Sequence, residues 1–296
     1  MDFYEQLWAL LRRDETGRGL ARWLPAPDFD ALTRTLLSAE RAVILTGFPV
    51  DCGGVFHGET DGPGGAANLA RALMTTGCDA TLLCGGVSLP QVRAAAGVLA
   101  PEAEVVCLPG GDTAAFARDL LTRLRPTHFF TIEHPGKGAD GHFYNMHGRV
   151  IDDMVTDAEA FLPLARRLGA VTLAVGDGGN ELGMGALRPV VEAHVPHGKR
   201  LAAVGRADFT LASGVSNWWG WAVAALLSAA TGRRLLPSPE EELRALRAVV
   251  ASGGVDGCTG KSDLSVGALP LSFHLDLLRR MEDALCAAPT RVLSGV

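Results

Sequence analysis

Acidic side chains and glycines occur together in two short runs of the chain. One run is Glu59-Thr60-Asp61-Gly62, and the other is Gly176-Asp177-Gly178-Gly179-Asn180-Glu181. Two carboxylates whose pKa values are pushed apart can act as general acid and general base, and glycines let backbone N–H groups approach a ligand. The two runs therefore predict one site for a small polar molecule. The candidate catalytic residues are Asp177 or Glu181 as the base and Glu59 or Asp61 as its acid partner.

A third polar segment, residues 133–149, places charged, amide and imidazole groups directly after an apolar run. Such a density of polar groups suits a polar substrate, and Arg149 with the helix N-termini expected at Asn180 and Ser216 would hold a carboxylate. The histidines of the segment lack the spacing of a helical zinc motif. The candidate substrate-binding residues are Glu133, Asp140, Asn145, Arg149, Gly178, Gly179, Asn180, Ser216 and Asn217.

The acids also leave open a divalent metal ion, which would polarise a carboxyl group of the substrate. Its candidate ligands are Glu59, Asp61, Asp140 and Asp177. Each polar segment has a structural interpretation as well. Residues 48–64 would form a solvated turn with Asp61 as a helix cap, residues 133–149 a surface excursion, and the run after Gly176 a tight strand-to-helix turn that Asn180 caps.

Short apolar runs alternate with helical patterns along the middle of the chain. The runs cover residues 42–45, 80–83, 104–107, 128–132, 171–175 and 201–204, with 209–211 as a further candidate. The helical patterns cover residues 65–76, 88–99, 112–124, 156–168, 180–193 and 216–230. The apolar runs have the length of strands buried on both faces, and the alternation predicts a parallel sheet with right-handed crossovers. Ligands bind at the carboxyl ends of such strands, which is where the acidic, glycine-rich runs fall.

The expected fold class is therefore α/β, an open, mainly parallel sheet with helices on both faces in a Rossmann-like, three-layer arrangement. Further helices are expected at both termini, over residues 3–11 and from the cap Asp28 to Glu40, and over residues 239–251 and 270–287. We expect a single domain over residues 1–296. It would comprise a helical N-terminal extension (1–40), a sheet core (41–232) and a helical C-terminal part (233–296).

Charge and cysteine content narrow the classes of function. The formal net charge is −6, and nucleic-acid binding needs a basic surface, so we expect no nucleic-acid partner. The uncharged stretch 209–232 is interrupted by polar residues and leaves only the length of a buried helix, so we expect no membrane span. The six cysteines form no C-x-x-C pair and predict reduced thiols, and the first residues lack a signal-peptide pattern. We expect a cytoplasmic protein, and the preference for Arg over Lys indicates a bacterial source.

Two nucleotide-binding patterns are incomplete. The run after Gly176 is not a dinucleotide motif, because no acid follows a second strand about twenty residues later. Gly260-Lys261-Ser262 resembles the end of a P-loop, but Gly254 lies one residue too far away and a helix, not a strand, precedes it. We therefore expect neither ATP nor NAD as a cofactor and a small molecule as the substrate, and a homo-oligomer is left open.

Together these motifs resemble the D-glutamate cyclase family, which includes the carboxy-terminal domain of a mitochondrial enzyme. The resemblance runs in order through most of the chain, from about residue 42 to residue 285. It rests on Thr46-Gly47-Phe48-Pro49, Glu59-Thr60-Asp61-Gly62-Pro63, the run from Glu133-x-Pro135-Gly136 through Asp140-Gly141 to Tyr144-Asn145-Met146-x-Gly148, residues 176–185, and Ser216-Asn217-Trp218.

The resemblance implies the cyclisation of D-glutamate to 5-oxo-D-proline with loss of water, a hydro-lyase reaction, without assigning the catalytic residues. Two other functions stay open: a metal-dependent hydrolase or phosphatase acting on a small anion, and a non-catalytic protein that binds small anions. One position departs from the family pattern, which has Val-Asp-Gly where this chain has Val266-Gly267-Ala268. The missing acid predicts either a changed substrate preference or a structural role for that position.

Overall fold

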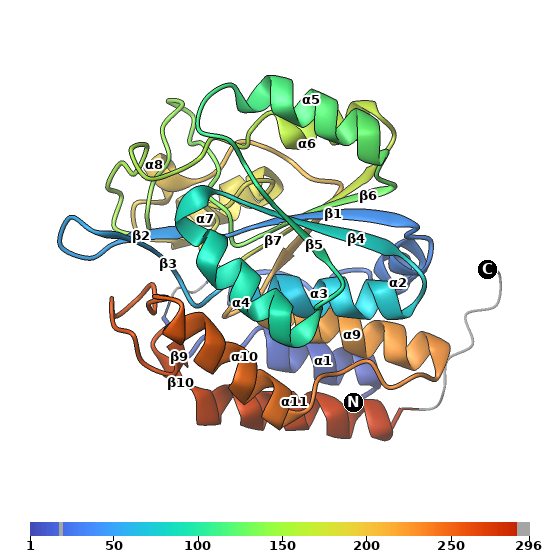
Figure 1. Ribbon diagram of the computed structural model, residues 1–296. Coiled ribbons are helices and arrows are strands. Elements are labelled where there is room, and N and C mark those ends of the chain that lie inside the picture. Colours follow the sequence, from blue (N-terminus) through green and yellow to red (C-terminus); the bar gives the residue numbers. More distant parts are fainter. Residues whose placement is uncertain (18–19, 289–296) are drawn as a thin grey trace.

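The protein folds around a six-stranded sheet in which every pair of neighbouring strands is parallel (Figure 1). The computed structural model describes residues 1–17 and 20–288. The strands lie in the order β5-β4-β1-β6-β7-β8, and their direction of succession reverses between β1 and β6, the point where open α/β sheets bind ligands. Their bounds are β1 Arg41–Thr46, β4 Asp79–Cys84, β5 Glu104–Cys107, β6 His128–Ile132, β7 Val171–Gly176 and β8 Phe209–Ala212.

Helices cover both faces of this sheet, as predicted (Figure 1). Beside one face lie α2 Phe29–Leu37, α3 Pro63–Thr75, α4 Leu89–Leu99 and α9 Trp218–Thr231, with α1 Phe3–Leu11, α10 Pro239–Ala251 and α11 Leu271–Cys286 packed outside them. Beside the other face lie α5 Thr113–Leu124, α6 Phe161–Arg167, α7 Arg188–His194 and α8 Gly198–Leu201. Three 3-10 turns complete the helical elements: η1 Ala21–Trp23, η2 Gly86–Ser88 and η3 Gly185–Leu187.

Strand β6 shows why continuous apolar runs form this sheet. Its side chains alternate between the two faces, so Phe129 packs against Phe161 and the α5 side while the next residue, Phe130, packs into the core around α3 and α9. All five residues of the strand are buried. A strand covered on both faces must be apolar throughout, and this is the pattern from which the strand was predicted.

Two predicted elements are wrong. Residues 201–204 do not form a strand, because their N–H groups pair elsewhere: Ala203 N–H donates to the Gly179 carbonyl and Val204 N–H to the Lys137 carbonyl. The helix predicted over residues 180–193 begins only at Arg188, after η3. The helix predicted over residues 156–168 is also shorter, since α6 covers Phe161–Arg167. The last residues of the predicted C-terminal part, 289–296, lie outside the described residues.

The longest uncharged stretch of the chain divides into β8 and the 14-residue helix α9, which is buried along most of its length. Within residues 1–17 and 20–288, no helix combines the length and the apolar character that crossing a bilayer requires.

Two small hairpins extend from this frame. Hairpin β2–β3 (Pro49–Asp51 and Phe56–Gly58) follows β1, and hairpin β9–β10 (Ser265–Val266 and Leu269–Pro270) precedes α11. The β9–β10 turn is Gly267-Ala268, and both residues have positive φ, at 60° and 63°. This is the geometry of a type I′ turn, for which Asp-Gly is a preferred sequence. The departure from the family pattern therefore falls on a turn whose second residue carries a Cβ in the left-handed region.

We expect Ala268→Gly to raise the free energy of unfolding by roughly 0.5–1 kcal/mol, because relief of the left-handed strain exceeds the extra chain entropy of glycine. Urea denaturation of the two proteins measures the change. The matched control is Ala9→Gly in α1, an exposed helical site, where the same substitution should cost about 1 kcal/mol. A loss of stability in both variants would contradict the strain at Ala268.

Candidate active site

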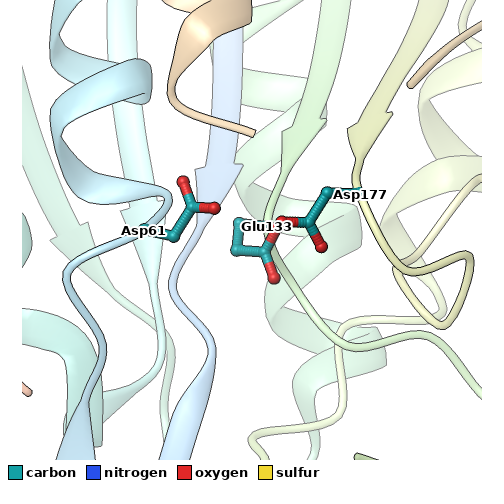
Figure 2. A group of neighbouring side chains, drawn as sticks. All are labelled: Asp61, Glu133 and Asp177. Carbon is teal, nitrogen blue, oxygen red and sulfur yellow. The ribbon is translucent and has the colours of Figure 1, made fainter. Parts of the chain in front are cut away.

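Three buried carboxylates meet at the carboxyl edge of the sheet (Figure 2). Glu133 follows β6 and Asp177 follows β7, while Asp61 lies after hairpin β2–β3, directly before α3. One oxygen of each lies within 4.8 Å of the others, and Glu133 stands between Asp61 and Asp177 in Figure 2. Carboxylate oxygens at such spacing can surround a single divalent cation. Two of the four predicted metal ligands, Asp61 and Asp177, are therefore brought together, with Glu133 as the third member.

A cavity of about 540 Å³ opens above Glu133 and Asp177, and Asp61 is not among the described residues that line it. Its buried floor carries Glu59, Glu133, Asp177 and Asn180. Its walls come from hairpin β2–β3, from residues 145–154 and from the loop 257–260. The wall residues from these three segments are Pro49, Val50, Asp51, Phe56, Asn145, Met146, His147, Arg149, Val150, Ile151, Asp153, Met154, Gly257, Cys258, Thr259 and Gly260.

Backbone N–H groups surround the carboxylate of Asp61. It accepts N–H groups from Gly62 (2.9 Å), directly before α3, and from Ser216 (3.1 Å) and Asn217 (2.8 Å), directly before α9. Hydrogen bonds of this kind favour the charged form of a carboxylate. Asp61 thus contacts the start of α9, which is a different helix from the one that the sequence suggested it would cap.

Asn217 makes the equivalent contacts at the start of α3. Its Oδ1 accepts the N–H groups of Gly62 (3.0 Å) and Gly65 (2.6 Å), and its Nδ2 donates to the Thr60 carbonyl (3.0 Å). The two helix starts are therefore locked to each other by side chains from the opposite helix. These contacts occupy the amide that was predicted to hold a substrate carboxylate.

Glu133 occupies a strained and enclosed position. Its φ is +46°, in the left-handed region, and its backbone is clamped between strands, since its N–H donates to the Val175 carbonyl and its C=O accepts from Gly47 N–H. Ser216 Oγ donates to Glu133 Oε2 at 2.5 Å. Strain at a non-glycine residue persists only where the surroundings enforce it, and such residues cluster at functional sites.

The pKa of Glu133 is raised well above its ordinary value. Burial is the largest cause, and the charge of Asp177 is the next, followed by Glu59, Asp61 and Glu181. The group therefore holds a proton at a pH where an ordinary glutamate has lost it. Glu133 had been predicted only to bind substrate, and a raised pKa is the property that a general acid at neutral pH requires.

The glycine-rich turn after β7 is organised around its own acid. Glu181 accepts the N–H groups of Asp177 (2.8 Å) and Gly178 (2.7 Å) through Oε1, and that of Gly179 (2.7 Å) through Oε2. Burial and the charge of Asp177 raise the pKa of Glu181, while these N–H donors oppose the rise. The N–H groups that were predicted to bind an anion are present, but they donate to the carboxylate of Glu181. The turn does not open a helix, because α7 starts only at Arg188.

Other predicted residues shape the loops around the cavity. Asn180 Nδ2 donates to the Tyr144 carbonyl (2.7 Å), and Asn145 Oδ1 accepts from the backbone of His147 and Arg149. Asp140 accepts the Tyr144 hydroxyl at 2.5 Å on an exposed loop and is not among the described residues that line the cavity. This position separates Asp140 from the cluster that could hold a cation.

Glu59 lies in the floor of the cavity and Arg149 lies at its mouth. Glu59 is buried in the floor against Gly257, where an added Cβ would stand 1.9 Å from Glu59 Oε2. A side chain at position 257 would therefore displace the Glu59 carboxylate from this position. Arg149 is exposed at the mouth, with a guanidinium nitrogen 4.0 Å from Asp51 of hairpin β2–β3. It is the one Lys or Arg among the described residues that line the cavity.

The loop after α10 forms a wall of the site that was not predicted from the sequence. Asp256 is fully buried and gathers this loop by accepting the N–H groups of Cys258 and Thr259 at Oδ1 and of Ala268 at Oδ2. The signal available was Val255-Asp256-Gly257, an acid–glycine pair like those of the other two runs. It was passed over because no strand of the predicted sheet precedes it.

We expect Glu181→Gln to lower the free energy of unfolding by roughly 1–3 kcal/mol, because an amide nitrogen cannot accept a buried N–H that the carboxylate accepted. Chemical denaturation measures the loss. The same substitution at the exposed Glu102 is the control and should change stability by less than about 0.5 kcal/mol. Equal stabilities of the two variants would show that the carboxylate does not organise the turn.

The amino-acid sequence of this chain is similar to those of known proteins. A family model described as "D-glutamate cyclase-like, C-terminal" matches residues 7–282. Human mitochondrial D-glutamate cyclase is 27% identical over an alignment 318 residues long, which covers 95% of this chain and 52% of the human protein. The chain thus spans about half the length of this relative. The protein belongs to the D-glutamate cyclase-like family, whose C-terminal part it matches over nearly its whole length.

Proposed function

We propose that this protein is an enzyme that cyclises D-glutamate to 5-oxo-D-proline and water. The observation that carries the proposal is the cluster of Asp61, Glu133 and Asp177 under a cavity, with a raised pKa on its central member. Family membership supports the same reaction. An acidic floor also suits the substrate's ammonium group, which must come close to the γ-carboxyl carbon before a bond can form.

The reaction moves two protons from the α-nitrogen to an oxygen of the γ-carboxyl group. The amine attacks the γ-carbon, the C–N bond of the lactam forms, and the C–O bond breaks as the oxygen leaves as water. We assign Asp177 as the base that accepts a proton from the ammonium, and Glu133 as the acid that protonates the departing oxygen. We propose that Glu59, in the same floor, holds the ammonium.

Two of the four carboxylates first considered for acid–base roles act differently in this proposal. Asp61 faces three N–H donors and Glu181 another three, so each stabilises backbone that carries the site. We propose that both are positioning residues. Arg149 at the mouth, with His147 beside it in the wall, would bind the α-carboxylate away from the acidic floor.

A divalent cation would fit the same three carboxylates, since hard cations take oxygen ligands. Asp61, Glu133 and Asp177 would hold it, although three of the roughly four lone-pair sites of Asp61 already accept N–H groups. When bound, such a cation would polarise the carboxyl or phosphoryl oxygen of a substrate. This spacing also favours the second candidate function, a metal-dependent hydrolase or phosphatase acting on small anions.

We expect the purified protein to form 5-oxoproline from D-glutamate, measured by chromatography, and Glu133→Gln and Asp177→Asn each to lower kcat by about 10²-fold or more. The control is Glu104→Gln at an exposed strand end. L-glutamate tests the stereochemical preference, and a chelator tests the cation. Near-normal turnover by both variants would contradict the assigned roles. Phosphate-ester hydrolysis that needs added metal, with no product from D-glutamate, would favour the hydrolase.

A further inference from the structure

We propose that the cavity accepts a second class of substrate, D-glutamate whose γ-carboxyl is joined to an amine, and that the site cyclises it with release of that amine. The inference rests on the proposed function, because the same floor would carry out both reactions. It follows from the size of the cavity, the chemistry of its walls and the apolar residues at its mouth.

The cavity is larger than free glutamate requires. Glutamate has about ten non-hydrogen atoms, and even at the roughly 30 Å³ that each water occupies in the liquid these would fill about 300 Å³. The cavity holds about 540 Å³. The remaining space takes a substituent at least the size of an aromatic ring.

Part of the wall beyond the acidic floor is apolar. Phe48, Ile151 and Met154 are buried and belong to one apolar cluster that also lines the cavity. Phe56 and Val150, on the hairpin and on the facing segment, are 40% and 45% exposed. Apolar side chains left exposed around the mouth of a polar site mark a surface that contacts a ligand. Free glutamate carries nothing that would use them.

Only one end of the substrate can carry the extra group. The α-amine must be free, because it is the nucleophile. The acidic floor repels the α-carboxylate, which would instead bind Arg149, the one Lys or Arg among the described residues that line the cavity. This contact requires a free carboxylate. The γ-carbonyl is the remaining point of attachment, and a group attached there extends from the floor along the apolar wall. Asp51 and Asp153 at the rim would accept the ammonium of the amine as it departs.

The chemistry balances without a further reactant. The α-nitrogen attacks the γ-carbonyl carbon, the lactam C–N bond forms, and the bond from that carbon to the substituent nitrogen breaks. Two protons leave the α-ammonium. A basic departing amine takes up both and leaves as an ammonium, whereas a weakly basic aromatic amine takes up one and the other passes to solvent. Glu133 donates to the departing nitrogen as it would to a departing oxygen, and Asp177 accepts from the α-nitrogen.

The test uses γ-D-glutamyl-p-nitroanilide and free D-glutamate as parallel substrates of the full-length protein, with enzyme-free samples as blanks. We expect p-nitroaniline and 5-oxo-D-proline in equal amounts from the anilide. In ¹⁸O-labelled water, release of D-glutamate or of labelled 5-oxo-D-proline would mean hydrolysis and would overturn the inference, as would an unreacted anilide. If D-glutamate is cyclised and the anilide is not, only this inference fails. If the anilide is cyclised and D-glutamate is not, only the proposed dehydration fails, and if neither reacts, both fail.

Substitution of a residue in the cavity wall tests whether the wall binds the substituent specifically or the anilide reacts only in a slow side reaction. Phe56→Ala should lower kcat/KM for the anilide relative to that for D-glutamate by about 10-fold or more, because loss of one apolar contact has an effect of that size. Leu168→Ala removes an apolar side chain that is 50% exposed and lies outside the described lining of the cavity, and it should leave this ratio unchanged. An unchanged ratio in Phe56→Ala would show that the wall does not bind the substituent.

Discussion

Three carboxylates buried within 4.8 Å of one another cannot all be charged at little cost. At an effective dielectric constant of about 20, each pair of anions at this distance repels by roughly 3 kcal/mol, and each anion also loses its hydration. The surroundings of the three carboxylates differ. Three N–H groups donate to Asp61, and such hydrogen bonds favour a charged carboxylate, while burial and four neighbouring acids raise the pKa of Glu133. The stored proton and the chemistry proposed for it are thus two consequences of one arrangement.

The rest of the site can be understood as the means of holding those groups together. Asp61 and Asn217 lock the starts of α3 and α9 to each other, and Glu181 closes the turn that carries Asp177. Glu133 is clamped between the ends of two strands with positive φ. Asn145 and Asn180 in the cavity lining likewise bond to backbone groups, so that these amides support the loops around the site. Catalytic groups need this kind of support, because small displacements are costly to the rate.

Much of the fold could be predicted from the sequence, because strands buried on both faces leave continuous apolar runs such as that of β6. The acids at strand ends could be found for the same reason, since parallel strands bring their carboxyl ends to one edge. That all these elements form a single domain stays a prediction. The start of α7 could not be predicted, because its delay depends on Glu181 folding back onto the turn. Nor could the role of Glu133 be separated from that of Asp61, since the difference arises from N–H groups contributed by residues 216 and 217.

The most direct test of this account is the protonation state of Glu133 itself. Infrared difference spectroscopy of wild-type protein against Glu133→Gln, at neutral pH and with chelator present, resolves its carboxyl group. The account predicts a protonated-carboxyl band that belongs to Glu133, remains at pH values where an ordinary glutamate is ionised, and disappears as the pH rises through the raised pKa. A spectrum in which Glu133 is already ionised at mildly acidic pH would contradict the account.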